Sequence, residues 1–312
     1  NFNATDDRHM FGDIYEKILK DLQSAGNAGE FYTPRAVTQF IVEQVNPRLG
    51  ETVLDPACGT GGFLTCVIDH LRKQAKTDAD ERKIQECFFG IEKKHLPHVL
   101  CMTNLLLHGI DVPSNVRHDN TLARPLKDWG PKERVDVIVT NPPFGGMEED
   151  GIESNYPAEF RTRETADLFL VLIMKILKPG GRAGIVLPDG TLFGEGVKTR
   201  IKEELLKECN LHTIIRLPNG VFAPYTGIKT NLLFFTKGAP TKDIWFYEHP
   251  YPPGAKSYNK GKPIRIEEFA AERQWWGNEK DGFASREENE YAWKVDIRRI
   301  VDEARVKAQP YW

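Results

Sequence analysis

Hydrophobic positions along this chain alternate between the short apolar runs of buried strands and the spacing of amphipathic helices. The apolar runs predict strands at residues 52–54, 87–91, 116–118, 135–140, 182–187, 212–217 and 231–236. The helical spacing predicts helices at residues 11–22, 37–45, 61–72, 97–108, 168–177 and 197–209. Strands that alternate with helices in this way are typical of an α/β fold with a doubly wound, mainly parallel sheet.

The pattern changes after Lys237, where proline, glycine, lysine and aromatic residues predict a loop. Residues 286–307 carry a few apolar anchors among many charges and predict a charged helix. Such a helix has marginal stability by itself, so we expect it to pack against another element. We hypothesise that it docks a partner subunit. The chain therefore divides into a helical lead-in at 1–45, a central α/β domain at 46–238 and an extension at 239–312 that carries this helix.

Composition narrows the class of protein. The chain has 312 residues, 40% of them hydrophobic, which is enough for a full core and excludes a disordered chain. The formal net charge of −3 lacks the basic excess of proteins that grip DNA by themselves, so a nucleic-acid substrate would need a local basic groove or a partner. Five scattered cysteines argue against a disulfide framework and favour a cytoplasmic location. No apolar stretch is long enough for a membrane span.

A glycine-rich loop follows the first predicted strand and opens a helix. It runs from Asp55 through Gly59, Thr60, Gly61 and Gly62. Glycines let backbone amides approach a ligand closely, and in an open α/β sheet this loop lies at the carboxyl edge, where ligands bind. The loop matches neither a phosphate-binding P-loop nor a dinucleotide-binding turn. We interpret it as part of a ligand site, with a tight turn that binds nothing as the alternative.

Two acidic residues end the next strands. Glu92 closes the second strand, where a carboxylate can accept hydrogen bonds from both hydroxyls of a ribose. Asp119 follows the third strand and could accept from an adenine amino group. The alternatives are a solvated acid at the end of a strand for Glu92 and a turn cap for Asp119.

The tetrapeptide Asn141-Pro142-Pro143-Phe144 directly follows the predicted strand 135–140. The prolines hold the loop rigid, so the Asn141 side-chain oxygen and the Pro142 carbonyl could each accept one hydrogen of a planar amine. This would aim the nitrogen lone pair at a methyl group, while Phe144 would stack on a base flipped out of a duplex. The alternative is a stiff loop with a core phenylalanine.

Other chemistries lack their residues. Methylation of cytosine at carbon 5 needs a nucleophilic cysteine, yet no cysteine lies in the 141–144 loop, and Cys58 lies in the glycine-rich turn instead. No cluster of His, Cys, Asp or Glu has the spacing of a metal site. We therefore expect direct transfer with no metal.

With these motifs, the chain resembles the modification subunits of type I restriction–modification systems, of the adenine-N6 class. The most specific element of the resemblance is the segment Gly29-Glu30-Phe31-Tyr32-Thr33-Pro34, which in this family covers the methionine end of the cofactor. Without the resemblance, this segment predicts only the start of a helix, with Thr33 at the N-cap and Pro34 at the first helical position.

The resemblance implies a Rossmann-like, S-adenosylmethionine-dependent methyltransferase fold and site-specific methylation of adenine N6 in double-stranded DNA. It assigns the loop from Asp55 to the cofactor, Glu92 to its ribose, Asp119 to its adenine, and residues 141–144 to catalysis. It places 226–231 near the target base. A separate specificity subunit reads the DNA sequence in this family, and a restriction subunit joins for cleavage.

Two features depart from the family pattern. Lys93 stands where an apolar residue often covers the adenine ring, and the N-terminal helical domain usual in the family is not seen in this chain. The tetrapeptide alone fits other planar nitrogens equally well, so a protein-glutamine or an rRNA-guanine methyltransferase is the nearest alternative. A subunit that keeps the fold as an inactive scaffold is a further one.

Overall fold

The computed structural model describes residues 14–15, 17–19, 32–259 and 261–301. Within the predicted helix 11–22, the described residues are helical, and the Tyr15 hydroxyl donates to the Leu100 carbonyl at 3.2 Å. Gly29, Glu30 and Phe31 of the predicted cofactor-covering segment lie outside the described residues.

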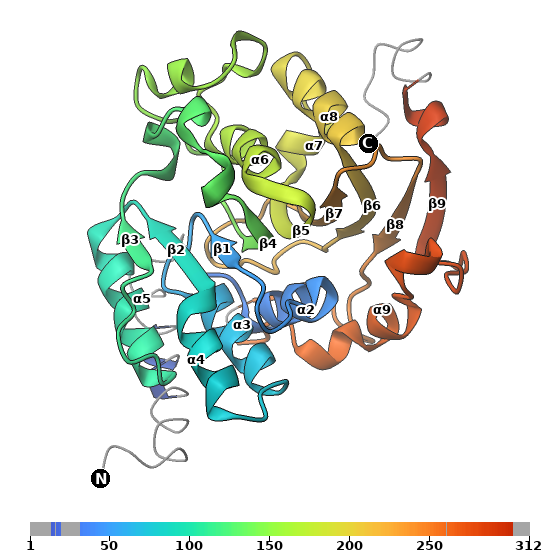
Figure 1. Cartoon of the computed structure of the whole chain (residues 1–312). Helices are drawn as coiled ribbons and strands as arrows, with labels where there is room; N and C mark the ends of the chain where they lie inside the picture. The colour runs from blue at the N-terminus through green and yellow to red at the C-terminus, as the bar shows by residue number, and fades with distance from the viewer. Residues whose placement is uncertain (1–13, 16, 20–31, 260, 302–312) are drawn as a thin grey trace.

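The described residues form one nine-stranded sheet, which confirms the predicted α/β class. Its order is β3-β2-β1-β4-β5-β7-β6-β8-β9 (Figure 1). The strands are β1 (Val53–Asp55), β2 (Phe88–Glu92), β3 (Val116–His118), β4 (Val135–Thr140), β5 (Leu177–Pro188), β6 (Cys209–Arg216), β7 (Thr230–Lys237), β8 (Asp243–Glu248) and β9 (Ala292–Asp296). Strands β3, β2, β1, β4 and β5 pair in parallel, whereas β7 runs antiparallel to both β5 and β6. The sheet is therefore mixed and mainly parallel.

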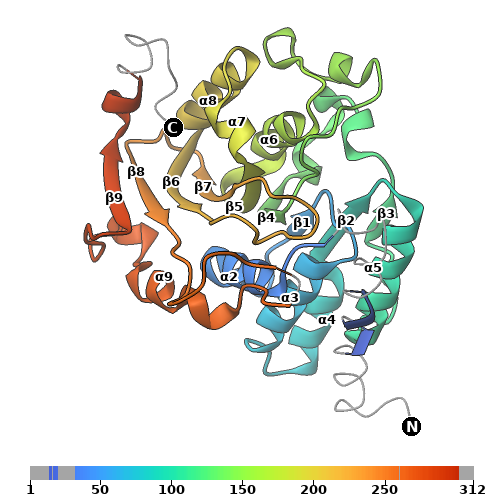
Figure 2. The same cartoon turned by 180° about the vertical axis from the view of Figure 1, so that it is seen from behind.

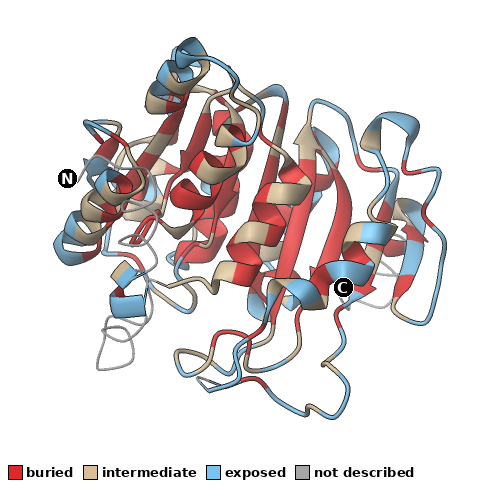
Figure 3. Ribbon diagram, turned by 90° about the horizontal axis from the view of Figure 1, so that it is seen from below, coloured by how far each residue is buried: buried red, intermediate tan, exposed pale blue. Residues whose placement is uncertain are grey.

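Helices cover both faces of this sheet. They are α2 (Arg35–Val45), α3 (Gly62–Arg72), α4 (Asp78–Cys87), α5 (His95–Leu107), α6 (Thr165–Ile176), α7 (Asp189–Phe193), α8 (Val197–Glu208) and α9 (Ala270–Trp275). Apolar residues of α2, α3 and α5 join one buried cluster, and those of α6 and α8 join the other. Figure 1 shows the two groups of helices on opposite sides of the strands, and Figure 3 shows the strands between them as buried. This is the doubly wound arrangement.

The strand order reverses between β1 and β4, since the chain moves outward from β1 to β3 on one side and then returns to β4 on the other. At such a point the loops after the two strands diverge and leave a crevice at the carboxyl edge of the sheet. The loops after β1 and β4 are the ones that carry the glycine-rich turn and Asn141.

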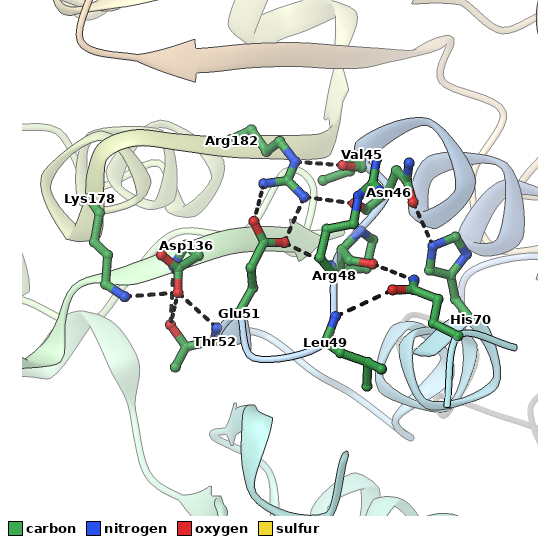
Figure 4. Close-up of polar contacts among 12 residues, drawn as sticks. Val45, Asn46, Arg48, Leu49, Glu51, Thr52, His70, Asp136, Lys178 and Arg182 are labelled. Atoms are coloured by element: carbon green, nitrogen blue, oxygen red, sulfur yellow. Dashed lines mark hydrogen bonds and ion pairs between the residues drawn. The ribbon is translucent and has the colours of Figure 1, made fainter. Parts of the chain in front are cut away.

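Polar contacts fasten the opposite, amino edge of the sheet (Figure 4). The Arg182 guanidinium on β5 donates to both carboxylate oxygens of Glu51, at 2.8 and 2.7 Å, and to the carbonyls of Val45 and Asn46. This planar, two-pronged pairing ties the end of α2 and the start of β1 to β5. These contacts stabilise the amino edge of the sheet, whereas ligands are expected at the carboxyl edge.

The region after residue 238 differs from the prediction. Residues 243–248, where no strand was predicted, form β8, and β9 (Ala292–Asp296) lies where a helix was predicted at 286–307. That prediction is wrong up to residue 296, although residues 297–301 are helical. Helix α4 was also not predicted; Thr77 and Asp80 form the capping box that begins it.

The segment after β8 forms α9 and then returns to the sheet as β9, which pairs with β8. In Figure 2 it passes beside α2, where the ring of Phe269 stacks on that of Phe40 at 4.3 Å. The division into segments at 45 and 238 remains a prediction. None of the helices in the described part of the chain is both long and apolar enough to cross a membrane.

Candidate active site

A cavity of about 280 Å³ lies at the carboxyl ends of β1, β2 and β4. The predicted site residues that line it are Tyr32, Thr33, Asp55, Gly59, Thr60, Gly62, Glu92, Asn141, Pro143 and Phe144. Pro34, Gly61, Asp119 and Pro142 are not among the lining residues. Segments more than 100 positions apart in the sequence therefore meet around one cavity.

The glycine-rich loop takes its shape from close packing. Gly61 has φ +86°, the left-handed region, and it is the N-cap of α3. A Cβ at this position would lie 2.8 Å from the Cys101 sulfur, so both the conformation and the space require glycine. The Gly59 N–H donates to the Glu92 carboxylate at 2.9 Å and joins the loop to the end of β2.

Two buried carboxyl groups, at the ends of the neighbouring strands β1 and β2, line the cavity. One oxygen of Asp55 accepts from the Thr140 hydroxyl at 2.7 Å, and burial raises the pKa of Asp55 to about 7. Glu92 accepts from the backbone N–H groups of Gly59 and Lys94, at 2.9 and 2.7 Å, while burial raises its pKa. Each carboxylate oxygen has two acceptor positions, so Glu92 keeps further capacity for a ligand.

Asp119 is placed differently. Its N–H donates to the Glu92 carbonyl at 3.0 Å, which joins the loop after β3 to the end of β2. Its side chain is exposed, and the residue does not line the cavity. Its assignment to an adenine ring stays a prediction.

Asn141 lies at the end of β4, opposite the lead-in to α2. Its side-chain Nδ2 donates to the Thr33 hydroxyl oxygen at 2.9 Å. Its Oδ1 is buried and has no hydrogen-bond partner among the residues that the structure describes. Buried polar atoms are normally satisfied, so an orphaned acceptor in a cavity wall points to a donor that a ligand supplies.

Phe144 lies at the outer end of this loop. Its ring is half-buried and meets the ring of Phe222 edge to face, with 5.8 Å between the centroids. Phe222 also lines a second cavity of about 130 Å³, together with Tyr32, Pro34 and Tyr225. Tyr32 and Arg35 line both cavities, so the two cavities are neighbours. Residues 226–231 do not line either cavity, and their predicted place near a target base remains untested.

The sequence pattern missed several residues of the cavity wall. The Asn104 Nδ2 donates to the Thr60 carbonyl at 3.1 Å, and its Oδ1 is buried without a partner in the described part of the chain. Lys93, which departs from the family pattern, pairs across the cavity mouth with Glu148 at 3.1 Å and Glu149 at 3.3 Å. No motif in the sequence around Glu148 indicated that it belongs to the site. Only the fold brings it to Lys93.

A family model for N-6 DNA methylases matches residues 6–310 of the chain. Over 302 residues the chain is 67% identical to the type I restriction enzyme EcoEI methylase subunit of Escherichia coli, covering 96% of this chain and 61% of the relative. It is 32% identical to the EcoKI methylase subunit of Escherichia coli K12, of which it covers 58%. The chain thus spans about six tenths of the length of these relatives.

Solved structures show the same likeness. A chain from a structure of a type I R-M system superposes with a TM-score of 0.90 at 43% identity, covering 97% of this chain and 63% of that one. The EcoKI M protein superposes with a TM-score of 0.76 at 28% identity, with 89% and 65% covered. The match of sequence and fold runs over nearly the whole chain, and this protein belongs to the N-6 DNA methylase family.

Proposed function

We propose that this chain is the catalytic part of a site-specific DNA methyltransferase that moves a methyl group from S-adenosylmethionine to N6 of an adenine flipped out of duplex DNA. It would act as the modification subunit of a type I restriction–modification complex. The observation that carries the proposal is the Asn141 Oδ1, a buried acceptor without a partner in the described structure, beside a cavity that already contains an acidic strand end and a glycine-rich turn.

The cavity residues fit S-adenosylmethionine. Bound there, this cofactor supplies a methyl group activated by a positively charged sulfur. Glu92 has free acceptor positions for ribose hydroxyls, and Asp55 offers a carboxyl group that a cationic ligand would favour in its ionised form. The orphaned Asn104 Oδ1 adds an acceptor for a ligand amine or hydroxyl. We extend the proposed cofactor contacts to Asn104 on this ground.

The Asn141 loop would prepare the amine for attack. The adenine N6 has low basicity because its lone pair is delocalised into the ring. If the Asn141 Oδ1 and the Pro142 carbonyl each accept one N6 hydrogen, the nitrogen is held with its lone pair directed at the methyl carbon. The acceptors would stabilise the positive charge that develops on N6, and one N6 proton would then pass to solvent water. Strong-base catalysis is not needed.

Phe144 and Phe222 would hold the base. Their edge-to-face contact fixes the Phe144 ring, which lines the larger cavity and keeps a face for stacking. Stacking on an aromatic ring contributes about 1–3 kcal/mol per base and does not depend on which base is bound. The ring therefore does not select adenine, and the amine acceptors require only that the bound base carries an exocyclic amine.

Sequence reading would come from a specificity subunit, and cleavage from a restriction subunit. The near-balanced net charge of −3 supports this division, because a chain that held duplex DNA alone would need a basic excess. The two relatives named above are each called a methylase subunit, which fits a chain that works inside a larger complex.

The test is transfer of a labelled methyl group by this chain, with and without its cognate specificity subunit, to DNA, RNA and protein in parallel reactions. We expect label in duplex DNA, and more of it with the specificity subunit. Label in protein or RNA but never in DNA would establish the glutamine or guanine alternative. Cofactor binding with no transfer to any acceptor would point to an inactive scaffold.

A further inference from the structure

The hydroxyl group of Thr33 and the amide group of Asn141 form a hydrogen bond between residues 108 positions apart. We propose that Thr33 is a positioning residue, which holds the Asn141 amide by its nitrogen and leaves the oxygen presented to the target amine. This inference rests on the proposed function and adds to it a residue that the family pattern assigns to covering the cofactor.

Thr33 is free for this contact because it does not cap the helix that follows. Helix α2 begins at Arg35, Pro34 holds its N-cap position, and there is no side-chain cap hydrogen bond. The predicted N-cap role of Thr33 is therefore wrong. Its hydroxyl oxygen accepts from the Asn141 Nδ2 at 2.9 Å instead.

An amide side chain has a donor end and an acceptor end, and rotation by 180° exchanges them. A target amine offers hydrogens, so it can bind only to the oxygen end. With Nδ2 held by Thr33, the Oδ1 remains buried and unpartnered among the described residues. In the opposite orientation the NH2 group would meet the amine donor to donor, and the site would be unproductive.

Both partners are held by rigid elements, which a positioning contact requires. Thr33 precedes α2, whose Ile41 and Val45 pack so closely on β5 that a Cβ at Gly184 would lie 2.6 Å from each of them. Asn141 follows β4, where Thr140 donates to the buried Asp55 at 2.7 Å. The hydrogen bond therefore links α2 to β4 across the mouth of the cavity.

The test compares Thr33→Val, which keeps the shape but removes the hydroxyl, with Thr33→Ser, which keeps the hydroxyl, in the complete methyltransferase complex. We expect kcat to fall roughly tenfold in Thr33→Val, the effect of one lost hydrogen bond, with the KM for S-adenosylmethionine within about twofold of wild type. Thr33→Ser should restore most of kcat. A raised cofactor KM with unchanged kcat would overturn the proposal, and so would equal losses in both variants.

A second comparison uses Asn141→Asp as the background. A carboxylate has two equivalent acceptor oxygens, so it has no orientation to select. We expect Thr33→Val to lower the remaining kcat of Asn141→Asp by less than about twofold, compared with roughly tenfold in the parent. An equal fold-loss in both backgrounds would mean that Thr33 acts by another route.

Crystal structures of the wild-type chain and of Thr33→Val separate this proposal from the proposed function. We expect the Asn141 amide to keep one orientation in the wild type and to rotate, or to occupy two orientations, in the variant. An unchanged amide in Thr33→Val would overturn the positioning role even if DNA methylation is found. A rotated amide in a chain without methyl transfer would support the positioning role and reject the proposed function.

Discussion

The carboxyl group of Asp55 in the candidate site makes the free energy of unfolding depend on pH. It is buried between β1 and β4, and burial raises its pKa from the ordinary value of 3.8 to about 7. Between these two values the folded chain binds the proton and the unfolded chain does not. The contribution of Asp55 to the free energy of unfolding is therefore full below about pH 4 and falls as the pH rises to about 7.

The variant Asp55→Asn should remove this dependence, because an amide does not titrate here but can still accept from Thr140. Relative to the variant, the free energy of unfolding of the wild type should fall by roughly 2–3 kcal/mol between pH 5 and pH 8. Urea unfolding of both proteins at the two pH values measures the difference. Parallel pH profiles would show that Asp55 does not titrate in this range.

Asn141 carries the proposed chemistry, so its removal should affect transfer and little else. We expect Asn141→Ala to lower the rate of methyl transfer at least about 100-fold, as for loss of a group that stabilises developing charge. Calorimetry should find cofactor binding within a few-fold of wild type. Equal loss of binding and transfer would mean that Asn141 supports the cavity rather than the reaction.

Sequence reasoning succeeded for single residues where the signal is local. The loops at Asp55 and Asn141 directly follow strands, and the fold brings both to one edge of the sheet, as expected. It failed for Thr33, because the cap was inferred from Thr33 and the adjacent Pro34 alone, whereas the actual partner of Thr33, Asn141, is 108 positions away. The pair Lys93–Glu148 was missed for the same reason.

At the scale of elements, strands β1, β4 and β7 were predictable because each is a mainly apolar run that is buried along most of its length. The last strand was not. The apolar anchors Tyr291 and Val295 are four positions apart, a spacing that also fits a helix. Strand β9 forms because β8 offers it an edge, with pairs from Asp243↔Asp296 to Tyr247↔Ala292. Pairing with a distant strand leaves no mark in the local pattern.

Strand β9 gives the end of the chain a structural role in addition to any role in docking. Because β9 completes the sheet, damage to it should destabilise the fold as well as any docking. Val295 is 4% exposed, so Val295→Asp would bury an unpaired charge and should lower the free energy of unfolding by about 3 kcal/mol. Lys294→Thr, at an exposed position of the same strand, is the control and should change it by less than about 1 kcal/mol. Equal effects in urea unfolding would argue against the strand.

At the scale of the whole molecule, the charge balance predicts dependence on a partner. With a net charge of −3, the chain alone should bind duplex DNA in the range of non-specific complexes, with a Kd of roughly 1–100 μM, falling off steeply as salt is raised. The specificity subunit should tighten binding at least about 100-fold on its recognition sequence. Fluorescence anisotropy with and without this subunit measures both. Tight binding by the chain alone would locate sequence recognition here.

The central claim concerns which atom receives the methyl group. The most direct measurement is mass spectrometry of the nucleosides from target DNA treated with the complete complex and S-adenosylmethionine, using wild type and Asn141→Ala in parallel. We predict N6-methyladenine in DNA treated with the wild type, and a background level with the variant. Methylation of cytosine, or undiminished N6-methyladenine with Asn141→Ala, would contradict the account.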